Sequence, residues 1–217
     1  MKTLALEFSS GRRSVAVLVD GIVRGEAQEA GGRHTRAFAL MDAALRAAGI
    51  EREEIELIAI GLGPGSYTGI RSAIAIAQGW QAAGSVKLAG VNSVEAMAAQ
   101  AHADGRRGRI HIFVDAQRGE FYFGAYELME EGPRLNEPLR IVTPDEAKPL
   151  SQGGGAIVWP ELREAFPDAT ILEPDAAMVG RLAAGRGEFV DGATLEPVYL
   201  RAVQFVKAPA ARSIPSA

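Results

Sequence analysis

Cysteine is absent from this sequence of 217 residues, and histidine is scarce, with only three copies. Without cysteine the chain has no disulfide, no thiolate nucleophile and no thiolate metal site. The three histidines, His34, His102 and His111, are isolated from one another in the sequence. A lone histidine is more often a packed or capping side chain than a metal ligand. We therefore expect no metal site in this chain.

Long hydrophobic runs and a strong excess of one charge are also missing. No apolar run approaches the roughly 18 residues that cross a bilayer, and Met1 to Thr3 lead directly into a strand pattern rather than a signal peptide. The net charge is −4 at pH 7, without a long basic run, which argues against a strong electrostatic hold on nucleic acid by this chain alone. With 47% hydrophobic residues, the composition predicts a soluble, cytoplasmic protein of one large domain or two small lobes.

The most distinctive segment is a glycine-dense loop, GLGPGSYTGIR at residues 61–71, between an apolar strand and an apolar helix. It is not a P-loop, because no lysine follows these glycines. A dinucleotide fingerprint would need a third glycine or alanine at Ser66 or Thr68, and an acid roughly 20 residues later, where 84–88 offer none. The segment therefore predicts a tight strand-to-helix turn that lets the helix start close against a sheet. The residues assigned to this structural loop are Gly61, Gly63, Pro64, Gly65, Thr68, Gly69 and Arg71.

The first half of the chain alternates short apolar strands with apolar helices. Asp20-Gly21 is a hairpin turn signal between two strands. The first helix is expected to begin at Thr35, as its N-cap, and to stop at Gly49. We expect strands at 4–8, 14–19, 22–27, 55–60 and 87–91, and helices at 35–48, 69–83 and 94–103.

The opening pattern returns in the second half of the chain. A strand at 110–116, a turn at 117–119 and a strand at 121–128 repeat the first strand, its turn and the next strand, so that Glu7 and Asp115 end corresponding strands. The alternative is two unrelated strands that each end in an acid. The repeat predicts two similar lobes facing each other across a cleft, 1–106 and 107–205, followed by a loose tail, 206–217. Further expected elements are strands at 139–142 and 156–159, a short helix from Thr143, a helix after Pro160 and a helix at 176–184.

The helices at 35–48 and 69–83 are apolar nearly all round, which a surface helix resting on one sheet does not require. Either the rest of this chain covers their second faces, or another chain does. Side by side, their small and apolar residues would form a flat surface that permits close helix approach in a four-helix interface. The candidate interface residues are Phe38, Leu40, Met41, Ala44, Ala47, Ile70, Ala73, Ile76, Ala77 and Trp80.

Four segments together resemble the TsaB family, a subunit of the bacterial tRNA threonylcarbamoyladenosine machinery. They are His34-Thr35, the loop 61–71, VDAQRGEFY at 114–122 and EPVYLR at 196–201, and they occur in the family's order and approximate spacing. The resemblance covers nearly the whole chain. It implies an α/β, actin-like fold of the ASKHA and ribonuclease H-like class, with two similar lobes that each contain a mixed sheet and flanking helices.

The resemblance also implies a function in modifying the adenosine beside the anticodon of tRNA. In such systems a separate enzyme makes threonylcarbamoyl-adenylate, TsaD transfers the threonylcarbamoyl group, and TsaB pairs with TsaD and keeps it active without doing the chemistry. TsaE docks on that pair, tRNA is reached only through the complex, and the TsaB helix surface can self-associate in isolation. Members have been described as glycoproteases through kinship with TsaD, but this chain lacks the His-x-x-x-His pair of a TsaD-like metal site. We therefore expect a scaffold subunit that is not an enzyme and not a protease.

An actin-like ATPase or small-molecule kinase is the alternative interpretation. In that case Glu7 and Asp115 would hold a metal–nucleotide complex, with Ser9 and Ser10 at the phosphate. Glu7 stands where this fold usually carries aspartate, and its extra methylene weakens the case for a metal site. We expect these four residues to form at most a degenerate nucleotide site, and the chain to need no cofactor of its own.

Overall fold

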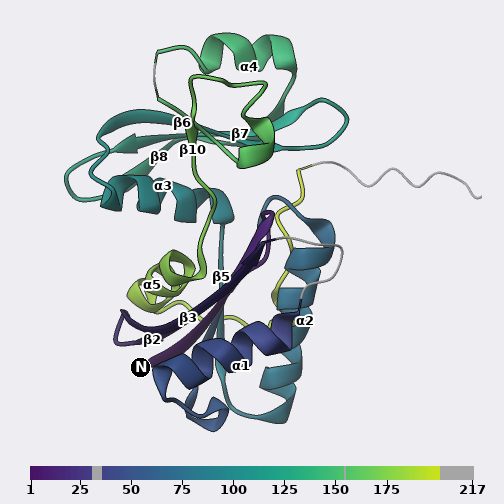
Figure 1. Ribbon diagram of the computed structural model, residues 1–217, viewed down its shortest axis with the longest axis vertical. Helices are drawn as coiled ribbons and strands as arrows, with labels where there is room; N and C mark the ends of the chain where they lie inside the picture. Colours follow the sequence, from purple (N-terminus) through teal and green to yellow (C-terminus); the bar gives the residue numbers. More distant parts are fainter. Residues whose placement is uncertain (31–35, 154, 201–217) are drawn as a thin grey trace, which may run out of the picture.

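The computed structural model describes residues 1–30, 36–153 and 155–200. The chain forms two lobes, one above the other along the long axis of the molecule (Figure 1). Each lobe is built on a five-stranded mixed sheet with helices packed against it. No helix in these residues is long and apolar enough to span a membrane.

The two sheets have the same strand order and the same strand directions. The order is β3-β2-β1-β4-β5 in the first sheet and β8-β7-β6-β9-β10 in the second. In both, the central strand pairs antiparallel with the following strand and parallel with the fourth. The repeat seen in the sequence is therefore a structural duplication. The strands are β1 Lys2–Glu7, β2 Arg12–Val19, β3 Ile22–Ala30, β4 Leu57–Gly61, β5 Lys87–Val91, β6 Gly108–Asp115, β7 Phe121–Leu128, β8 Pro133–Val142, β9 Ala156–Val158 and β10 Thr170–Ile171.

Local sequence signals explain most of the element boundaries. Asp20 and Gly21 both have positive φ, 50° and 77°, as a two-residue hairpin between β2 and β3 requires. Gly49 ends the first helix in the left-handed conformation, with φ 65°. Thr143 and Glu146 form a capping box at the start of α4. The helices are α1 Ala37–Ala48, α2 Tyr67–Ala83, α3 Ser93–Ala103, α4 Pro144–Leu150 and α5 Ala176–Arg186, with 3-10 turns η1 Arg52–Glu54, η2 Pro160–Leu162 and η3 Gly192–Thr194.

Several predicted elements differ from those observed. The helix expected after Pro160 is a single 3-10 turn, and β10 was not predicted at all. The strand expected at 139–142 begins at Pro133, because the segment pairs along most of the length of β7. The expected cap Thr35 and its neighbour His34 lie outside the described residues.

Alternation along β1 divides the core of the first lobe into two layers. Leu4 and Leu6 face α1 and α2 on one side of the sheet. Ala5, on the other side, packs with residues of α3 and α5. Helix α3 also packs against β6 and β7 through Val94 and Met97, so it lies between the two sheets and belongs to the core of both lobes.

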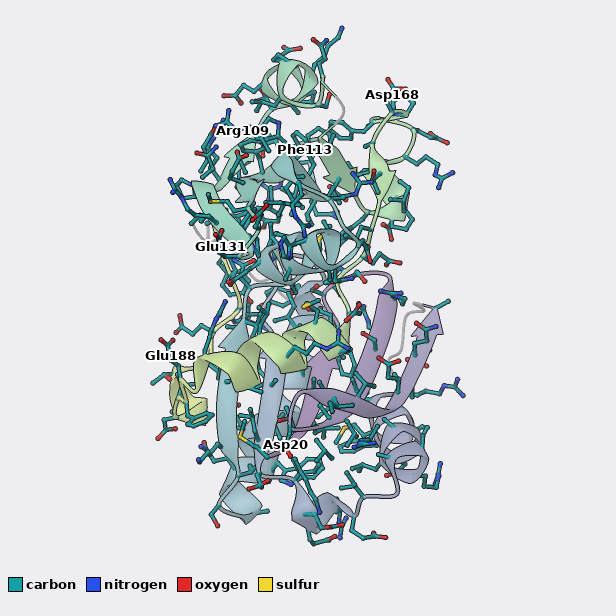
Figure 2. All side chains as sticks on the ribbon, turned by 90° about the vertical axis from the view of Figure 1, so that its left-hand side faces the viewer. Asp20, Arg109, Phe113, Glu131, Asp168 and Glu188 are labelled. Carbon is teal, nitrogen blue, oxygen red and sulfur yellow. The ribbon has the colours of Figure 1, made fainter. Side chains whose placement is uncertain are left out.

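Helix α5 packs against the first sheet, although the sequence placed residues 107–205 together in the second lobe. Figure 2, where the labelled Glu188 lies two residues after the end of this helix, shows α5 lying across the strands of the first lobe. Gly180 permits a close contact, since a Cβ at this position would lie only 2.5 Å from Leu18 Cδ1 and 3.1 Å from Ala5 Cβ. A helical apolar pattern does not specify which sheet it will cover, so only the tertiary contacts assign α5.

Candidate functional site: an interlobe cleft and an exposed helix face

The glycine segment is a turn that brings the start of α2 close to the end of β1. A Cβ at Gly69 would lie 2.0 Å from the Phe8 carbonyl oxygen, and one at Gly61 would lie 1.9 Å from Glu7 Oε2. Gly63 and Gly65 have φ of 82° and 145°, which favour glycine, and the Gly63–Pro64 peptide is cis. Each of these four glycines therefore has a steric or conformational reason to lack a side chain.

Three residues assigned to the loop, Thr68, Gly69 and Arg71, lie in α2 instead. Helix α2 starts at Tyr67, with Ser66 as its N-cap, because Ser66 Oγ accepts the Gly69 N–H at 3.3 Å. Arg71 Nε donates to the Tyr199 hydroxyl at 2.9 Å, and its guanidinium lies 4.0 Å from the centre of the Tyr67 ring. This stack attaches residues near the C-terminal end of the described chain to the first turn of α2.

Glu7 is fully buried beneath the glycine loop. Its Oε1 accepts the Ser9 N–H at 2.7 Å, and its Oε2 accepts the Ser93 hydroxyl at 2.7 Å. Burial raises the pKa of Glu7, and the hydrogen bonds from Ser9 and Ser93 oppose that rise in part. The carboxylate is therefore engaged inside the fold rather than presented to the cleft.

The other three residues of the expected nucleotide site do meet. Ser9, Ser10 and Asp115 line a hollow of about 440 Å³ between the lobes. The Asp115 carboxylate accepts hydrogen bonds from the Gln117 backbone N–H and side-chain amide, both at 2.7 Å. Because Glu7 does not line this hollow, two acids from opposite lobes do not converge there.

The rest of the cleft is occupied by protein groups. The buried Arg13 guanidinium donates to the Phe8 and Ser10 carbonyls and to Ser66 Oγ, and burial lowers its pKa. The Trp159 ring packs so closely on the loop that a Cβ at Gly65 would lie 2.6 Å from it. At this end of the cleft, the positive charge of Arg13 is therefore engaged by groups of the chain itself, and the Trp159 ring fills the space beside the loop.

Carboxylate and histidine side chains do not gather into a metal centre in the described part of the chain, where no three of them are close enough to share an ion. His102 Nε2 lies 2.8 Å from the Met129 carbonyl oxygen, and His111 Nδ1 lies 2.5 Å from that of Leu150. Both histidines therefore contact backbone rather than each other.

An apolar groove lies between the exposed faces of α1 and α2. It has a volume of about 660 Å³ and is lined by Phe38 and Ala39 of α1 and by Ala75, Ile76, Gly79 and Trp80 of α2. A second hollow of about 890 Å³ continues from it, sharing Phe38 and Trp80, and carries a charged rim that includes Asp42, Arg52 and Lys87. Phe38 is 71% exposed between the two. Figure 1 shows the two helices on the same side of the first sheet.

The structure narrows the predicted interface to its exposed members. Phe38 and Ala47 are exposed, and Ile76 and Trp80 are half-buried. The other six are buried in the core of the first lobe, because a wider face of each helix packs against the sheet than the sequence indicated. The buried six are Leu40, Met41, Ala44, Ile70, Ala73 and Ala77. Ala75 and Gly79, which share the second face of α2 with Ile76, also line the groove, although they were not among the candidate interface residues. Ala39 lines it too, and its position next to Phe38 in the sequence gave no spacing signal for it.

Several curated proteins similar to this chain carry the name TsaB. The Escherichia coli (strain K12) "tRNA threonylcarbamoyladenosine biosynthesis protein TsaB" is 29% identical, over 93% of this chain and 95% of that protein. The protein of the same name from Buchnera aphidicola is 27% identical, over 80% of this chain and 88% of that protein. A family model described as "TsaD: tRNA N6-adenosine threonylcarbamoyltransferase" matches residues 19–146, more than half of the chain. The chain belongs to this family, in its TsaB group.

The TsaB-group chain is also similar to solved structures. One is YeaZ from Pseudomonas aeruginosa, with a TM-score of 0.75 and 27% identity over 92% of this chain and 99% of that one. Another, from the same organism, is described as similar to the peptidase YEAZ, with a TM-score of 0.78 and 28% identity over the same shares. Together with the duplicated sheets, this likeness confirms the predicted two-lobed, actin-like fold of the TsaB group.

Proposed function

We propose that this chain is the non-catalytic TsaB subunit of tRNA threonylcarbamoyladenosine biosynthesis, which pairs with TsaD and keeps it active. The similarity to E. coli TsaB along almost the whole of both chains supports the pathway. The observation that carries the scaffold role is the exposed α1–α2 groove, because contiguous apolar surface between two helices is typical of a protein–protein interface.

The groove suits a helical partner. Ala75 and Gly79 on α2 are small, so a partner helix can approach closely, while Phe38 and Trp80 supply the large apolar contacts that dominate interface energies. We propose that the surface binds TsaD, that TsaE docks on the assembled pair, and that tRNA is reached only through the complex. In the absence of TsaD the same groove would mediate self-association of the chain.

The interlobe cleft supports the view that the chain itself does no chemistry. Glu7 is fully buried, its two carboxylate oxygens accept hydrogen bonds from Ser9 and Ser93, and it does not line the hollow, so it does not face a metal–nucleotide complex opposite Asp115. The residues present do not fit the metal-dependent nucleotide site that the fold suggests. Ser9, Ser10 and Asp115 still share a hollow, and the ATPase or kinase alternative depends on them.

Reconstitution of tRNA modification tests the proposal. TsaD, TsaE, the enzyme that makes threonylcarbamoyl-adenylate, its substrates and unmodified tRNA are incubated with and without this chain, and modified adenosine is measured after digestion of the tRNA to nucleosides. We expect modification only when the chain is present, and negligible ATP hydrolysis or peptide cleavage by the chain alone. Equal modification without the chain would contradict the scaffold role, and ATP turnover by the isolated chain that Asp115→Asn abolishes would favour the ATPase.

A further inference from the structure

The buried carboxylate of Glu7 connects three separate segments of the first lobe. Glu7 ends β1, and its Oε2 accepts the hydroxyl of Ser93, the first residue of α3. Ser93 Oγ in turn accepts the Gly63 N–H at 3.0 Å, and the Ser93 N–H donates to the Gly63 carbonyl oxygen at 2.9 Å. The end of β1, the glycine loop and the start of α3 are therefore joined through a single serine.

Three hydrogen bonds converge on Glu7 and Ser93. Each carboxylate oxygen of Glu7 receives one donor, the Ser9 N–H and the Ser93 O–H, and the Ser93 oxygen receives the Gly63 N–H. Buried donors without acceptors are costly, so removing either the carboxylate or the hydroxyl leaves groups unpaired. The packing is equally restrictive, because Gly61 must lack a Cβ to make room for Oε2.

The same loop determines where α2 begins. Its far end is held by the Ser66 N–H, which donates to the Ser9 carbonyl oxygen at 2.7 Å, and by Arg13, which donates to Ser66 Oγ at 3.0 Å. Ser66 is the N-cap of α2. Both ends of the loop are therefore fixed against the end of β1, one through Glu7 and Ser93 and the other through Ser9.

Helix α2 transmits the position of the loop to the exposed groove. Its 17 residues extend about 25 Å at 1.5 Å per residue. Ile76 and Trp80, which line the groove, lie in the middle and last turns of this helix. A rigid helix that shifts or rotates at its first turn carries those side chains with it.

We propose that Glu7 is a positioning residue for the partner surface: through the Ser93 hydroxyl it fixes Gly63, and thereby the placement of α2 and its groove residues. The acid that ends the first strand acts inside the chain, as an anchor for the loop, instead of at a ligand. The effect on partner binding depends on the proposed pairing with TsaD, whereas the effect on the loop does not.

Three variants of the full chain test the role. Glu7→Gln and Ser93→Ala each break the network, and Ser14→Ala is the matched control. Ser14 is also a buried serine, and it pairs with Glu7 across β1 and β2 on the same face of the sheet, but its Oγ accepts the Ala176 N–H of α5 at 3.0 Å instead of bonding the glycine loop. All three are expected to lower the melting temperature. Glu7→Gln and Ser93→Ala are also expected to weaken TsaD binding about tenfold per folded molecule, while Ser14→Ala leaves it within twofold of wild type.

Trp159 provides a readout that does not require TsaD. Its ring packs on Gly65 of the loop, so its fluorescence reports loop displacement once Trp80 is replaced by phenylalanine to remove the second tryptophan. In this background we expect Glu7→Gln and Ser93→Ala to shift the Trp159 emission maximum and Ser14→Ala to leave it unchanged.

A double variant tests whether the two residues act together, measured in the chain that keeps Trp80. Glu7→Gln/Ser93→Ala should bind TsaD no more weakly than the weaker-binding single variant, because both substitutions act along one path.

The outcomes separate this proposal from the proposed function. If wild-type chain binds TsaD and the two network variants bind equally well, the positioning role is wrong and the pairing stands. If wild-type chain does not bind TsaD, the pairing is wrong, and the Trp159 signal alone decides the role of Glu7. A lower melting temperature with unchanged emission and unchanged affinity would show that the network only stabilises the fold. If Glu7→Gln does not fold, Ser93→Ala gives the answer.

Discussion

Phe38 makes the sharpest prediction about the partner surface. The side chain projects from α1 between the two hollows of the groove and is 71% exposed in the isolated chain. Phe38→Ala therefore removes surface that only a partner would bury. The stability of the isolated chain should change by less than about 0.5 kcal/mol, because little of the ring is packed in the core.

The expected loss of affinity follows from the exposed fraction. Complete burial of a phenylalanine stabilises by about 1.5–3 kcal/mol. Covering the 71% that is exposed should therefore contribute about 1–2 kcal/mol to binding. That free energy corresponds to a dissociation constant for TsaD that rises about 5-fold to 30-fold in Phe38→Ala.

Isothermal titration of TsaD with wild-type and variant chains measures this change. Leu135→Ala is the matched control, since Leu135 is 54% exposed but lies on β8 in the second lobe. Its dissociation constant should stay within twofold of wild type. If Phe38→Ala binds as tightly as wild type, or if Leu135→Ala weakens binding more, the α1–α2 groove is not the TsaD surface.

Two further predictions concern α2 and the buried acid. In thermal unfolding, Gly69→Ala should destabilise the folded chain by about 1–3 kcal/mol, because the added Cβ would meet the Phe8 carbonyl. Gly79→Ala should be neutral or stabilise the chain by up to about 1 kcal/mol, because a Cβ there has no neighbour within 4 Å outside its own helix backbone. Equal stability of the two variants would contradict the close approach of α2 to β1. Because burial raises the pKa of Glu7, the folded chain binds this proton more tightly than the unfolded chain. Relative to Glu7→Gln, wild type should lose stability as pH rises from about 4.3 to the folded pKa, and a parallel pH dependence of the two melting temperatures would refute this.

Much of the fold could be predicted because local signals determine it. The Asp20-Gly21 hairpin, the stop at Gly49 and the duplicated strand pattern each depend on residues close together in the sequence. Strand β10 was not predicted, because it depends on pairing with β9, and the helix predicted after Pro160 was wrong, because the segment forms only a short 3-10 turn.

The candidate site was harder to predict than the fold. The sequence indicated that Glu7 and Asp115 end corresponding strands, and they do, but Glu7 turns inward to Ser9 and Ser93 while Asp115 borders the cleft. Ser93 had no signal of its own, because its role depends on α3 returning beneath the glycine loop. A contact across 86 positions of sequence leaves no local pattern.

The sequence by itself determined the repeated strand–turn–strand pattern, the turn chemistry of the glycine loop and the presence of two unusually apolar helices, because each depends on residue type and short-range spacing. The tertiary structure alone decided which faces of those helices remain exposed, that α5 covers the first sheet, and that Glu7 anchors a loop. These outcomes depend on packing between distant segments, since a buried carboxylate or an apolar stripe acquires its role from the groups that the fold places beside it.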